Sequence, residues 1–225
     1  MNYLRLHPWN VSPEEAVQIQ CRLASQVKIT GGKRIFRTVA GIDVSYNRRD
    51  PVLHAAVVVL KLENLEMIEV AGASGTVIFS YVPGLLSFRE IPIVLKAWRK
   101  LKLCPDCIVC DGQGLAHPRR FGLACHLGMV LSLPSVGCAK SRLLGTFEEP
   151  GFSRGGRSPL WDHGEQVGAV VRTRDGVAPV FVSVGHKIGL ERTIDLVLST
   201  CPRYRLPEPI RQAHRSVNER RRFEL

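Results

Sequence analysis

The chain has 225 residues, of which 45% are hydrophobic; this allows one generous domain or two small ones, and we expect a single α/β domain over residues 1–225. No apolar run approaches the ~18 residues of a membrane-spanning helix and no signal peptide opens the chain, so we expect a cytoplasmic protein without membrane contact. The net charge of +11 favours polyanions, above all nucleic acid, as partners.

The first predicted element is a helix over residues 12–28. Ser12 can cap it, Pro13 suits its first turn, and the two glutamates that follow complement the positive end of the helix dipole. A glycine pair at residues 31–32 is predicted to end this element.

Three strands are predicted next, over residues 39–46, 54–62 and about 67–79. The short turns between them, the first an Arg-Arg-Asp-Pro turn, predict an antiparallel meander. Asp43 lies in the middle of the first strand, where a buried carboxylate is costly unless it is paired or bound to a metal. An acid on the solvent face of an alternating strand would give the same pattern, so Asp43 alone decides nothing.

A turn at residues 80–86, which carries an aromatic residue, leads into a predicted helix whose apolar residues between 93 and 101 follow the helical period. Pro92 belongs near the first turn of a helix, which predicts that Glu90 lies at or beside the helix start. A helix N-terminus is a favourable place for any carboxylate. Glu90 could therefore be structural as well as functional.

A short apolar strand over residues 107–110 ends at Asp111, and a Gly-x-Gly turn and a His-Pro-Arg-Arg cluster follow. Ligand sites in open α/β sheets lie at the carboxyl ends of strands, so Asp111 stands where a site is expected. A lone Asp after a strand is more often a turn former or helix cap. Its functional interpretation depends on Asp43 and Glu90.

The rest of the chain is predicted to alternate helices and strands around one long surface loop. The elements are a buried helix over 121–131, a strand over 134–140 that ends in Lys140, the loop over 143–160, a hairpin over 166–173 and 178–184, a helix over 189–200, and a last helix from Pro207 that carries His214 and a basic tail.

The seven cysteines are odd in number and lie mostly in apolar segments, which predicts reduced thiols. Cys104 and Cys107 form a C-x-x-C pair, with Cys110 following. No second pair stands at a zinc-site spacing, and a redox pair would open a helix, whereas this pair enters a strand. Both uses are disfavoured.

Asp43, Glu90 and Asp111 lie on three elements that could converge at one site. Three carboxylates suit a Mg²⁺-dependent phosphodiesterase, because Mg²⁺ prefers oxygen ligands and can acidify a bound water. Lys140 could stabilise negative charge on the phosphate or orient the attacking water. The residues therefore predict phosphodiester hydrolysis.

This order of elements resembles the ribonuclease H-like fold, a mixed sheet of three antiparallel strands and then parallel strands, flanked by helices. Within that fold, the local motifs resemble the endonuclease V family of deoxyinosine 3′-endonucleases. The matching stretches run from about residue 39 to 214 and read VAGIDVSY, YVPGLLSFRE, DGQGLAHPRRFGLACHLG, GCAKSRLLG, APVFVSVGH and PEPIRQAH.

The resemblance implies incision of DNA at the second phosphodiester bond 3′ to a deaminated purine, leaving 3′-hydroxyl and 5′-phosphate ends. It implies Mg²⁺ as cofactor, with Mn²⁺ able to substitute, and a monomer as the default. The metal-site acids it implies are Asp43, Glu90 and Asp111, and the further groups near the scissile phosphate are Lys140, His117 and His214. Each histidine could instead be a hydrogen-bonded structural residue.

The resemblance also implies a wedge that fills the space left by a rotated-out base, and a pocket whose backbone groups read hypoxanthine. Ser80 stands where the family usually has proline, which predicts a less stiff wedge. The residues implied against the substrate are Tyr81, Val82, Pro83 and Gly84 of the wedge, Gly84 again with Leu86, Gly112 and Gly122 of the pocket, and Arg119.

Three other functions were weighed. An inosine-specific endoribonuclease of the same fold would use the same acids, and no motif here reads a 2′-hydroxyl. A catalytically silent inosine-binding module predicts a missing acid, yet all three are present. A general resolvase or another ribonuclease H-like nuclease would lack the YVPG and DGQGLAHPR motifs.

Overall fold

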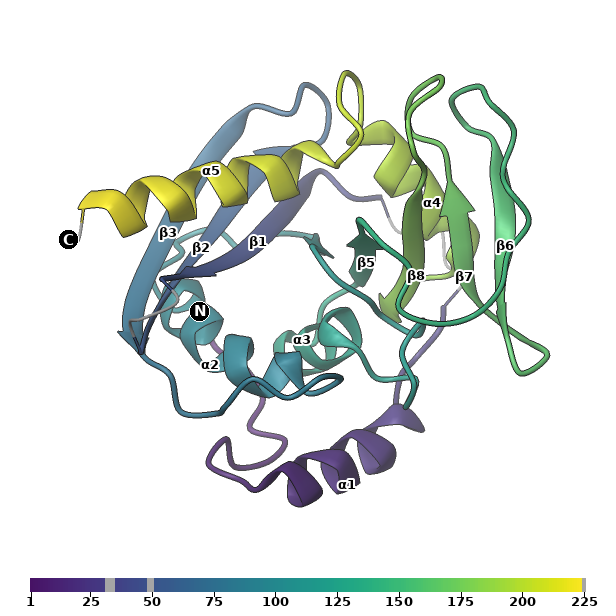
Figure 1. Cartoon of the computed structure of the whole chain (residues 1–225). Coiled ribbons are helices and arrows are strands. Elements are labelled where there is room, and N and C mark those ends of the chain that lie inside the picture. The colour runs from purple at the N-terminus through teal and green to yellow at the C-terminus, as the bar shows by residue number, and fades with distance from the viewer. Residues whose placement is uncertain (31–34, 48–50, 224–225) are drawn as a thin grey trace.

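The structure is a computed structural model that describes residues 1–30, 35–47 and 51–223 (Figure 1). Its centre is an eight-stranded mixed sheet with the order β3-β2-β1-β4-β5-β8-β7-β6. The strands are β1 (Thr38–Tyr46), β2 (Val52–Lys61), β3 (Met67–Thr76), β4 (Cys107–Cys110), β5 (Ser135–Ala139), β6 (Arg157–Asp162), β7 (Glu165–Val171) and β8 (Val180–His186). The expected mixed sheet, with an antiparallel meander followed by parallel strands, is confirmed.

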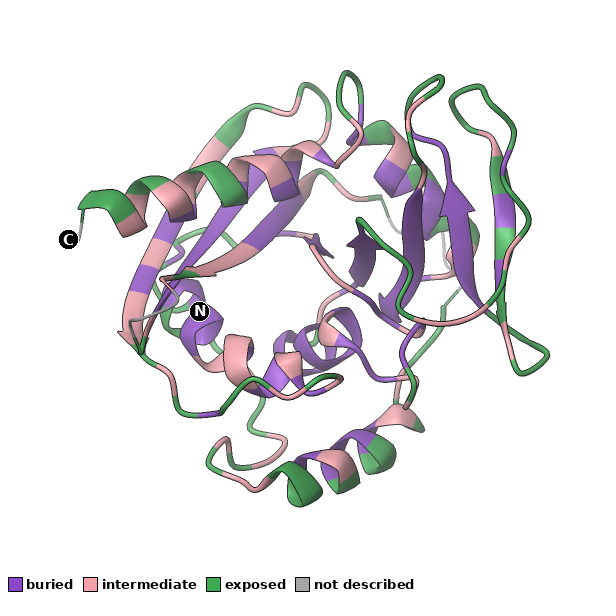
Figure 2. Cartoon of the chain, in the orientation of Figure 1, coloured by how far each residue is buried: buried purple, intermediate pink, exposed green. Residues whose placement is uncertain are grey.

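Helices cover both faces of this sheet. The helices are α1 (Pro13–Ala24), α2 (Leu86–Trp98), α3 (Leu123–Leu131), α4 (Leu190–Ser199) and α5 (Glu208–Phe223). α2 and α3 share one core with the sheet, while α4 and α5 share a second core on the opposite face. α1 packs outside α2 and α3 through a third cluster. The central strands are therefore buried, and the outer sides of α1 and α5 stay exposed (Figure 2).

The strand register brings two predicted acids side by side. β1 pairs with β4 in parallel, and Ile42 is opposite Cys110 at the end of the paired segment. Asp43 follows Ile42 and Asp111 follows Cys110, so the two acids lie next to each other at this end of the sheet. β5 continues the parallel set, with Gly137 opposite Cys110, so Lys140 follows at the same end of the sheet.

α2 begins earlier than the sequence predicts. Its first residue is Leu86, so Glu90 lies in the second turn and Pro92 lies inside the helix. A proline there removes one backbone hydrogen bond, to the carbonyl of Phe88. The helix persists because Phe88, Ile91 and other side chains on both sides of the proline are buried.

The predicted loop over residues 143–160 is wrong at its end. It contains the start of β6, an edge strand whose residues alternate between exposed and buried. β6 joins β7 through His163 and Gly164, which both have positive φ, as a two-residue hairpin requires. The predicted hairpin of β7 and β8 is present, with Ala169 opposite Val182, and becomes three-stranded.

Other boundaries shift by a few residues: α1 ends at Ala24, and β3 runs unbroken through its glycines to Thr76. The glycine pair at residues 31–32 and most of the turn predicted around residues 48–50 lie outside the described residues. No helix of the described chain is both long and apolar enough to cross a membrane.

Candidate active site

Three carboxylates come together where β1, β4 and α2 meet; Asp43, Glu90 and Asp111 are called the acid centre below. The Asp43 and Asp111 side chains are 16% and 18% exposed. Burial, and then the charges of Asp43 and Asp111, raise the pKa of Glu90 to about 8. The acid centre therefore holds more negative charge than its own residues stabilise.

Two nitrogen groups contact the acid centre from other elements. Lys140, directly after β5, donates to Asp111 Oδ2 at 2.5 Å. His214 Nδ1 on α5 lies 2.7 Å from Asp43 Oδ2. Burial raises the pKa of Asp43, and the hydrogen bond from His214 acts in the opposite direction. Lys140 and His214 are thus brought together with the three acids, as predicted.

Asn218 fixes the orientation of the His214 ring. Its Nδ2 lies 3.0 Å from His214 Nε2 and also donates to the His214 carbonyl at 2.8 Å. Because an amide nitrogen only donates, Nε2 accepts and the neutral ring carries its proton on Nδ1, toward Asp43. Ser45 donates to the Asn218 side-chain oxygen at 3.2 Å and completes the chain.

A glycine on β1 lets α5 approach closely enough for these contacts. A Cβ added at Gly41 would lie 2.0 Å from the carbonyl oxygen of Pro209, next to the first residue of α5. No side chain can be accommodated at that distance from backbone. The Gly41 contact therefore brings His214 over Asp43.

The donor set of the acid centre suits Mg²⁺. Within the described part of the chain, no group of three His, Cys, Asp or Glu side chains has the geometry to hold a metal ion. Mg²⁺, however, is often bound by only one or two carboxylates, with waters and substrate phosphates completing its shell. Asp43 and Asp111 are adjacent, partly exposed, and could supply such a pair. After burial, the charges of Asp43 and Asp111 help to raise the pKa of Glu90, and a bound cation would offset this part of the effect.

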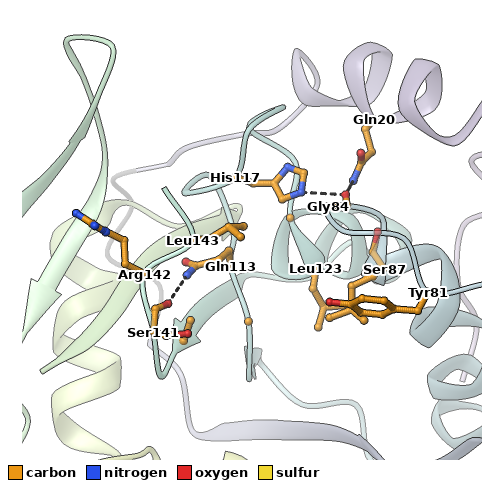
Figure 3. A pocket seen from close by; sticks show the side chains of 14 residues that line it. Gln20, Tyr81, Gly84, Ser87, Gln113, His117, Leu123, Ser141, Arg142 and Leu143 are labelled. Carbon is orange, nitrogen blue, oxygen red and sulfur yellow. Dashed lines mark hydrogen bonds between the residues drawn. The ribbon is translucent and has the colours of Figure 1, made fainter. Parts of the chain in front are cut away.

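A cavity of about 280 Å³ opens next to the acid centre, since Gly112, the residue after Asp111, lines it. Figure 3 shows the side chains around this cavity. The cavity contains all four residues predicted for the base pocket, and Tyr81 of the predicted wedge lies at its wall. The lining residues are Gln20, Tyr81, Gly84, Leu86, Ser87, Gly112, Gln113, His117, Gly122, Leu123, Ala139, Ser141, Arg142 and Leu143. Small residues and backbone make up much of this wall, which suits a flat aromatic base.

One wall of the cavity is a turn at residues 82–85, which we call the Gly84 turn. Gly84 has a φ of +77°, and its carbonyl oxygen accepts three hydrogen bonds. The donors are Gln20 Nε2 at 3.1 Å, His117 Nε2 at 3.0 Å and an Arg119 terminal nitrogen at 2.8 Å. Figure 3 shows Gln20 and His117 converging on this oxygen. The turn is therefore held from two separate segments, α1 and the loop between β4 and α3.

The placement of His117 changes the role that the sequence suggested. Its Nδ1 accepts the backbone N–H of Arg119 at 3.2 Å, so its proton lies on Nε2 and is donated to Gly84. Burial, and then the charge of Arg119, lower its pKa to about 4. With both ring nitrogens bonded, His117 suits the structural alternative, holding the cavity wall, better than proton transfer at the phosphate.

Arg119 also holds the turn, and its predicted contact with the substrate stays a prediction. Besides Gly84, its Nε donates to Gln20 Oε1 at 2.5 Å. Gln20 also donates to the carbonyl of Phe121 at 3.0 Å. This network joins α1 to the cavity, which the sequence did not predict.

The wedge residues lie as expected of a protruding loop. Tyr81 is 63% exposed, and Pro83 is exposed beside it. Val82 packs partly against the third hydrophobic cluster. Arg89 donates to the carbonyl of Phe79 at 3.1 Å and fixes the start of the loop. Tyr81 is therefore free to contact a partner, while the backbone below it is anchored.

A second hollow, of about 540 Å³, lies on the other side of Lys140; we call it the cationic groove. Ala139 and Ser141 line the cavity, whereas Lys140 between them lines the groove. The groove residues are Lys140, Tyr204, Arg205, Leu206, Ile210, Arg211, His214 and Arg215. The two hollows thus lie on either side of the acid centre's lysine.

Sequence reasoning missed Gln20, Asn218 and Tyr204. Gln20 is only 1% exposed, and a polar residue on the apolar side of a predicted helix was the available signal. Asn218 follows His214 by four residues, the spacing of helix neighbours. Tyr204 carried no signal, because its importance depends on the fold around it.

Comparison with known proteins gives one consistent result. The family model described as Endonuclease V matches residues 21–215. An endonuclease V from Gloeobacter violaceus is 47% identical over 218 residues, which are 96% of this chain and 89% of that protein. The crystal structure of endonuclease V from Streptomyces avermitilis superposes with a TM-score of 0.92 at 43% identity, covering 96% of both chains.

A more distant structure contains nucleic acid. Endonuclease V from Ciona intestinalis was solved in complex with a 23mer DNA that contains an inosine followed by a ribo-adenosine. It superposes with a TM-score of 0.85 at 24% identity, covering 96% of this chain and 100% of that one. At this identity the likeness is one of fold.

Proposed function

The chain belongs to the endonuclease V family, a family of metal-dependent nucleases that act on DNA, and we propose that it is a DNA repair endonuclease specific for deoxyinosine. It hydrolyses the second phosphodiester bond 3′ to the deaminated base and leaves 3′-hydroxyl and 5′-phosphate ends. The observation that carries the proposal is the acid centre, with Lys140, immediately beside a base-sized cavity.

The cavity supplies recognition of the lesion. A base rotated out of the duplex would enter between the Gly84 turn and Gly122, where backbone groups can approach its edge. Tyr81 would fill the space that the base leaves in the stack, which offsets part of the few kcal/mol that unstacking costs. The inosine-containing DNA bound by the Ciona intestinalis protein supports this substrate class.

The acid centre carries the chemistry. Asp43 and Asp111, with Glu90 behind them, would hold Mg²⁺, for which Mn²⁺ could substitute. When bound, the ion supplies positive charge to the phosphate and acidifies a bound water. His214 bonds to Oδ2 of Asp43 and helps to hold this carboxylate in place for the ion. Lys140 is placed to donate to the phosphate where negative charge develops.

The proposal is tested with an end-labelled duplex that contains one deoxyinosine, incubated with Mg²⁺. We expect one nick at the second bond 3′ to the lesion and none in the matched adenosine duplex. Asp111→Asn should lose about a thousandfold in rate, because several kcal/mol of charge stabilisation depend on the metal site. Absence of a nick, or an Asp111→Asn variant as fast as the wild type, would contradict the proposal.

The same assay decides the nature of the strand. The inosine is presented in DNA, in RNA, and in DNA with a single ribonucleotide at the cleaved linkage. A DNA repair enzyme cuts the first at least as fast as the other two. Faster cleavage of RNA would make the protein an inosine-specific endoribonuclease with the same acid centre.

A further inference from the structure

We propose that the cationic groove is a second nucleotide-binding site, which holds the strand 3′ to the cleaved bond and stacks its first base on Tyr204. This inference rests on the proposed function, because it takes the cleaved bond to lie at the acid centre. The groove extends the substrate contact to a part of the strand that neither the wedge nor the cavity reaches.

The position of the groove follows from Lys140 and His214. Both line the groove, and each also bonds to a carboxylate of the acid centre, Lys140 to Asp111 and His214 to Asp43. The residues on either side of Lys140 line the cavity instead. A strand with its lesion in the cavity passes the acids and then enters the groove. Since the lesion lies 5′ to the cleaved bond, the strand in the groove lies 3′ to it.

The charges of the groove fit a phosphate backbone. Its lining contains Lys140, Arg205, Arg211 and Arg215, and among the described lining residues there is no acid. Arg205 donates to two carbonyl oxygens, of Lys140 at 2.6 Å and of Pro179 at 2.9 Å, so it is held in place, and it forms no ion pair with an acid of the described residues. Phosphate is the anion that such a row of guanidinium groups recognises.

Two of these arginines also have donors to spare. The Nε atoms of Arg205 and Arg211 are buried and make no hydrogen bond within the described chain. Arg211 Nε lies 3.5 Å from Glu208 Oε2, a loose ion pair. These Nε atoms are covered by protein, so only the exposed donors of each guanidinium group could reach a phosphate in the groove. Arg215 pairs with Glu219 at 2.9 Å on the exposed side of α5, where such pairs contribute little.

Tyr204 gives the groove a surface for a base. The guanidinium carbon of Arg211 lies 3.2 Å from the centre of the Tyr204 ring, which covers one face and orients the ring. The side chain is still 46% exposed. An aromatic ring beside a cationic track is the arrangement by which proteins hold single-stranded nucleic acid, with stacking that tolerates any base. Tyr204 thus complements Tyr81 across the cleaved bond.

The test removes the base that Tyr204 would stack. A deoxyinosine duplex carries an abasic residue as the first nucleotide 3′ to the cleaved bond, and single-turnover rates are measured below saturation. We expect the wild type to cut it about tenfold more slowly than intact DNA. Tyr204→Leu should lose about the same factor on intact DNA and no more on abasic DNA. Tyr204→Phe, which keeps the ring, should recover the rate.

Arg203→Gln is the matched control for charge. Arg203 directly precedes Tyr204 in the chain, but its side chain lines a different hollow. When the logarithm of DNA affinity is plotted against the logarithm of salt concentration, Arg211→Gln should make the slope less steep by about one, because one phosphate contact is lost. Arg203→Gln should leave this slope unchanged. Equal effects of both variants would indicate a general charge effect and would overturn the groove as a site.

A crosslink separates failure of the groove from failure of the proposed function. DNA with 5-iodouracil as that first nucleotide is irradiated with the protein in Ca²⁺, which prevents cleavage, and the adduct is mapped by mass spectrometry. An adduct on Tyr204 supports the groove whether or not the wild type nicks DNA. An adduct elsewhere, or a Tyr204→Leu variant as sensitive to the abasic residue as the wild type, overturns it even if nicking is observed.

Discussion

The acid centre and the Gly84 turn are joined by α2, since Gly84 precedes its first residue and Glu90 lies in its second turn. The two regions differ in how fully their polar groups are hydrogen-bonded or paired with charge. At the turn, one carbonyl accepts three hydrogen bonds, and both nitrogens of His117 are bonded. At the acid centre, three carboxylates share one lysine and one histidine, and the pKa of Glu90 is raised to about 8.

This difference separates shape from reactivity. A fully bonded turn has one stable arrangement, so it can define the wall of a cavity without contacting the substrate through its own polar side chains. A centre with excess negative charge is stabilised only when a cation arrives, so it is prepared for a metal ion and a phosphate. Substitutions in the two regions should therefore change different measurements.

Lys140→Met gives the largest expected effect. The rate of cleavage should fall by about 10²–10³-fold, because a donor aimed at developing charge is lost. Mg²⁺ binding to the DNA-free protein should become tighter, since the ammonium group no longer competes for Asp111 Oδ2. Calorimetric titration and single-turnover rates measure the two changes.

Lys61→Met is the control for that variant. It removes an exposed ion pair, with Glu66 at 2.8 Å, that lies outside the acid centre. It should change neither rate nor Mg²⁺ affinity. If Lys140→Met weakens Mg²⁺ binding instead, Lys140 does not compete with the metal, and the acid centre does not differ from the Gly84 turn in the way described above.

Glu90→Gln gives the next largest effect, on stability. In metal-free protein the folded state keeps the Glu90 proton up to about pH 8, whereas the unfolded chain releases it near the ordinary pKa of 4.5. The free energy of unfolding therefore falls as pH rises between these values and is constant above them. Glu90→Gln removes this fall and should be more stable than the wild type at pH 8.5 by on the order of 2 kcal/mol.

Urea unfolding in EDTA at pH 5 and pH 8.5 measures that difference. Added Mg²⁺ should stabilise the wild type more than the variant.

The Gly84 turn responds to pH in the opposite direction, because His117, with a pKa of about 4, resists protonation that the unfolded chain accepts near pH 6.5. Its contribution to stability is lost as pH falls from 6.5 to 4. If the free energy of unfolding of Glu90→Gln changed with pH as it does in the wild type, Glu90 would be ionised in the folded protein and the prediction would be wrong.

Gly84→Ala gives the smallest effect of the three, on recognition. A Cβ at Gly84 would lie 2.7 Å from the Arg119 guanidinium, and its φ of +77° is strained for alanine by about 1–2 kcal/mol. The displaced turn should weaken binding of deoxyinosine DNA by about tenfold. Binding of undamaged DNA and of Mg²⁺ should not change.

Gly164→Ala separates backbone strain from the site. Gly164 has a φ of +79°, and a Cβ there would have no atom within 4 Å. The variant should lose similar stability but keep the affinity for deoxyinosine DNA, measured by fluorescence anisotropy. If both variants lost affinity for deoxyinosine DNA equally, the Gly84 turn would not determine recognition of the lesion.

The acid centre was more predictable from the sequence than the turn. Asp43 and Asp111 each follow residues with the pattern of a buried strand, and parallel pairing then places them side by side. Lys140 ends a third such segment. Glu90 was placed less well, because Pro92 indicated a later helix start and buried side chains on both sides overcame that preference.

The turn could not be derived in the same way. The cavity residues came from resemblance to a family, and their arrangement depends on Gln20, which lies 64 residues from Gly84 in sequence. The resemblance placed His117 near the scissile phosphate and Arg119 against the substrate. Only the fold shows that a carbonyl oxygen takes their hydrogen bonds.

The close contact between Gly41 and Pro209 has a consequence for how the protein is made. It positions α5, which contributes His214, Asn218, Arg211 and Arg215, and α5 is synthesised after the elements that carry the acid centre. A nascent chain on the ribosome thus carries its carboxylates long before it carries the helix that covers Asp43. A polypeptide that does not yet include α5 lacks half of the groove residues, so the groove is assembled only after α5 has been synthesised.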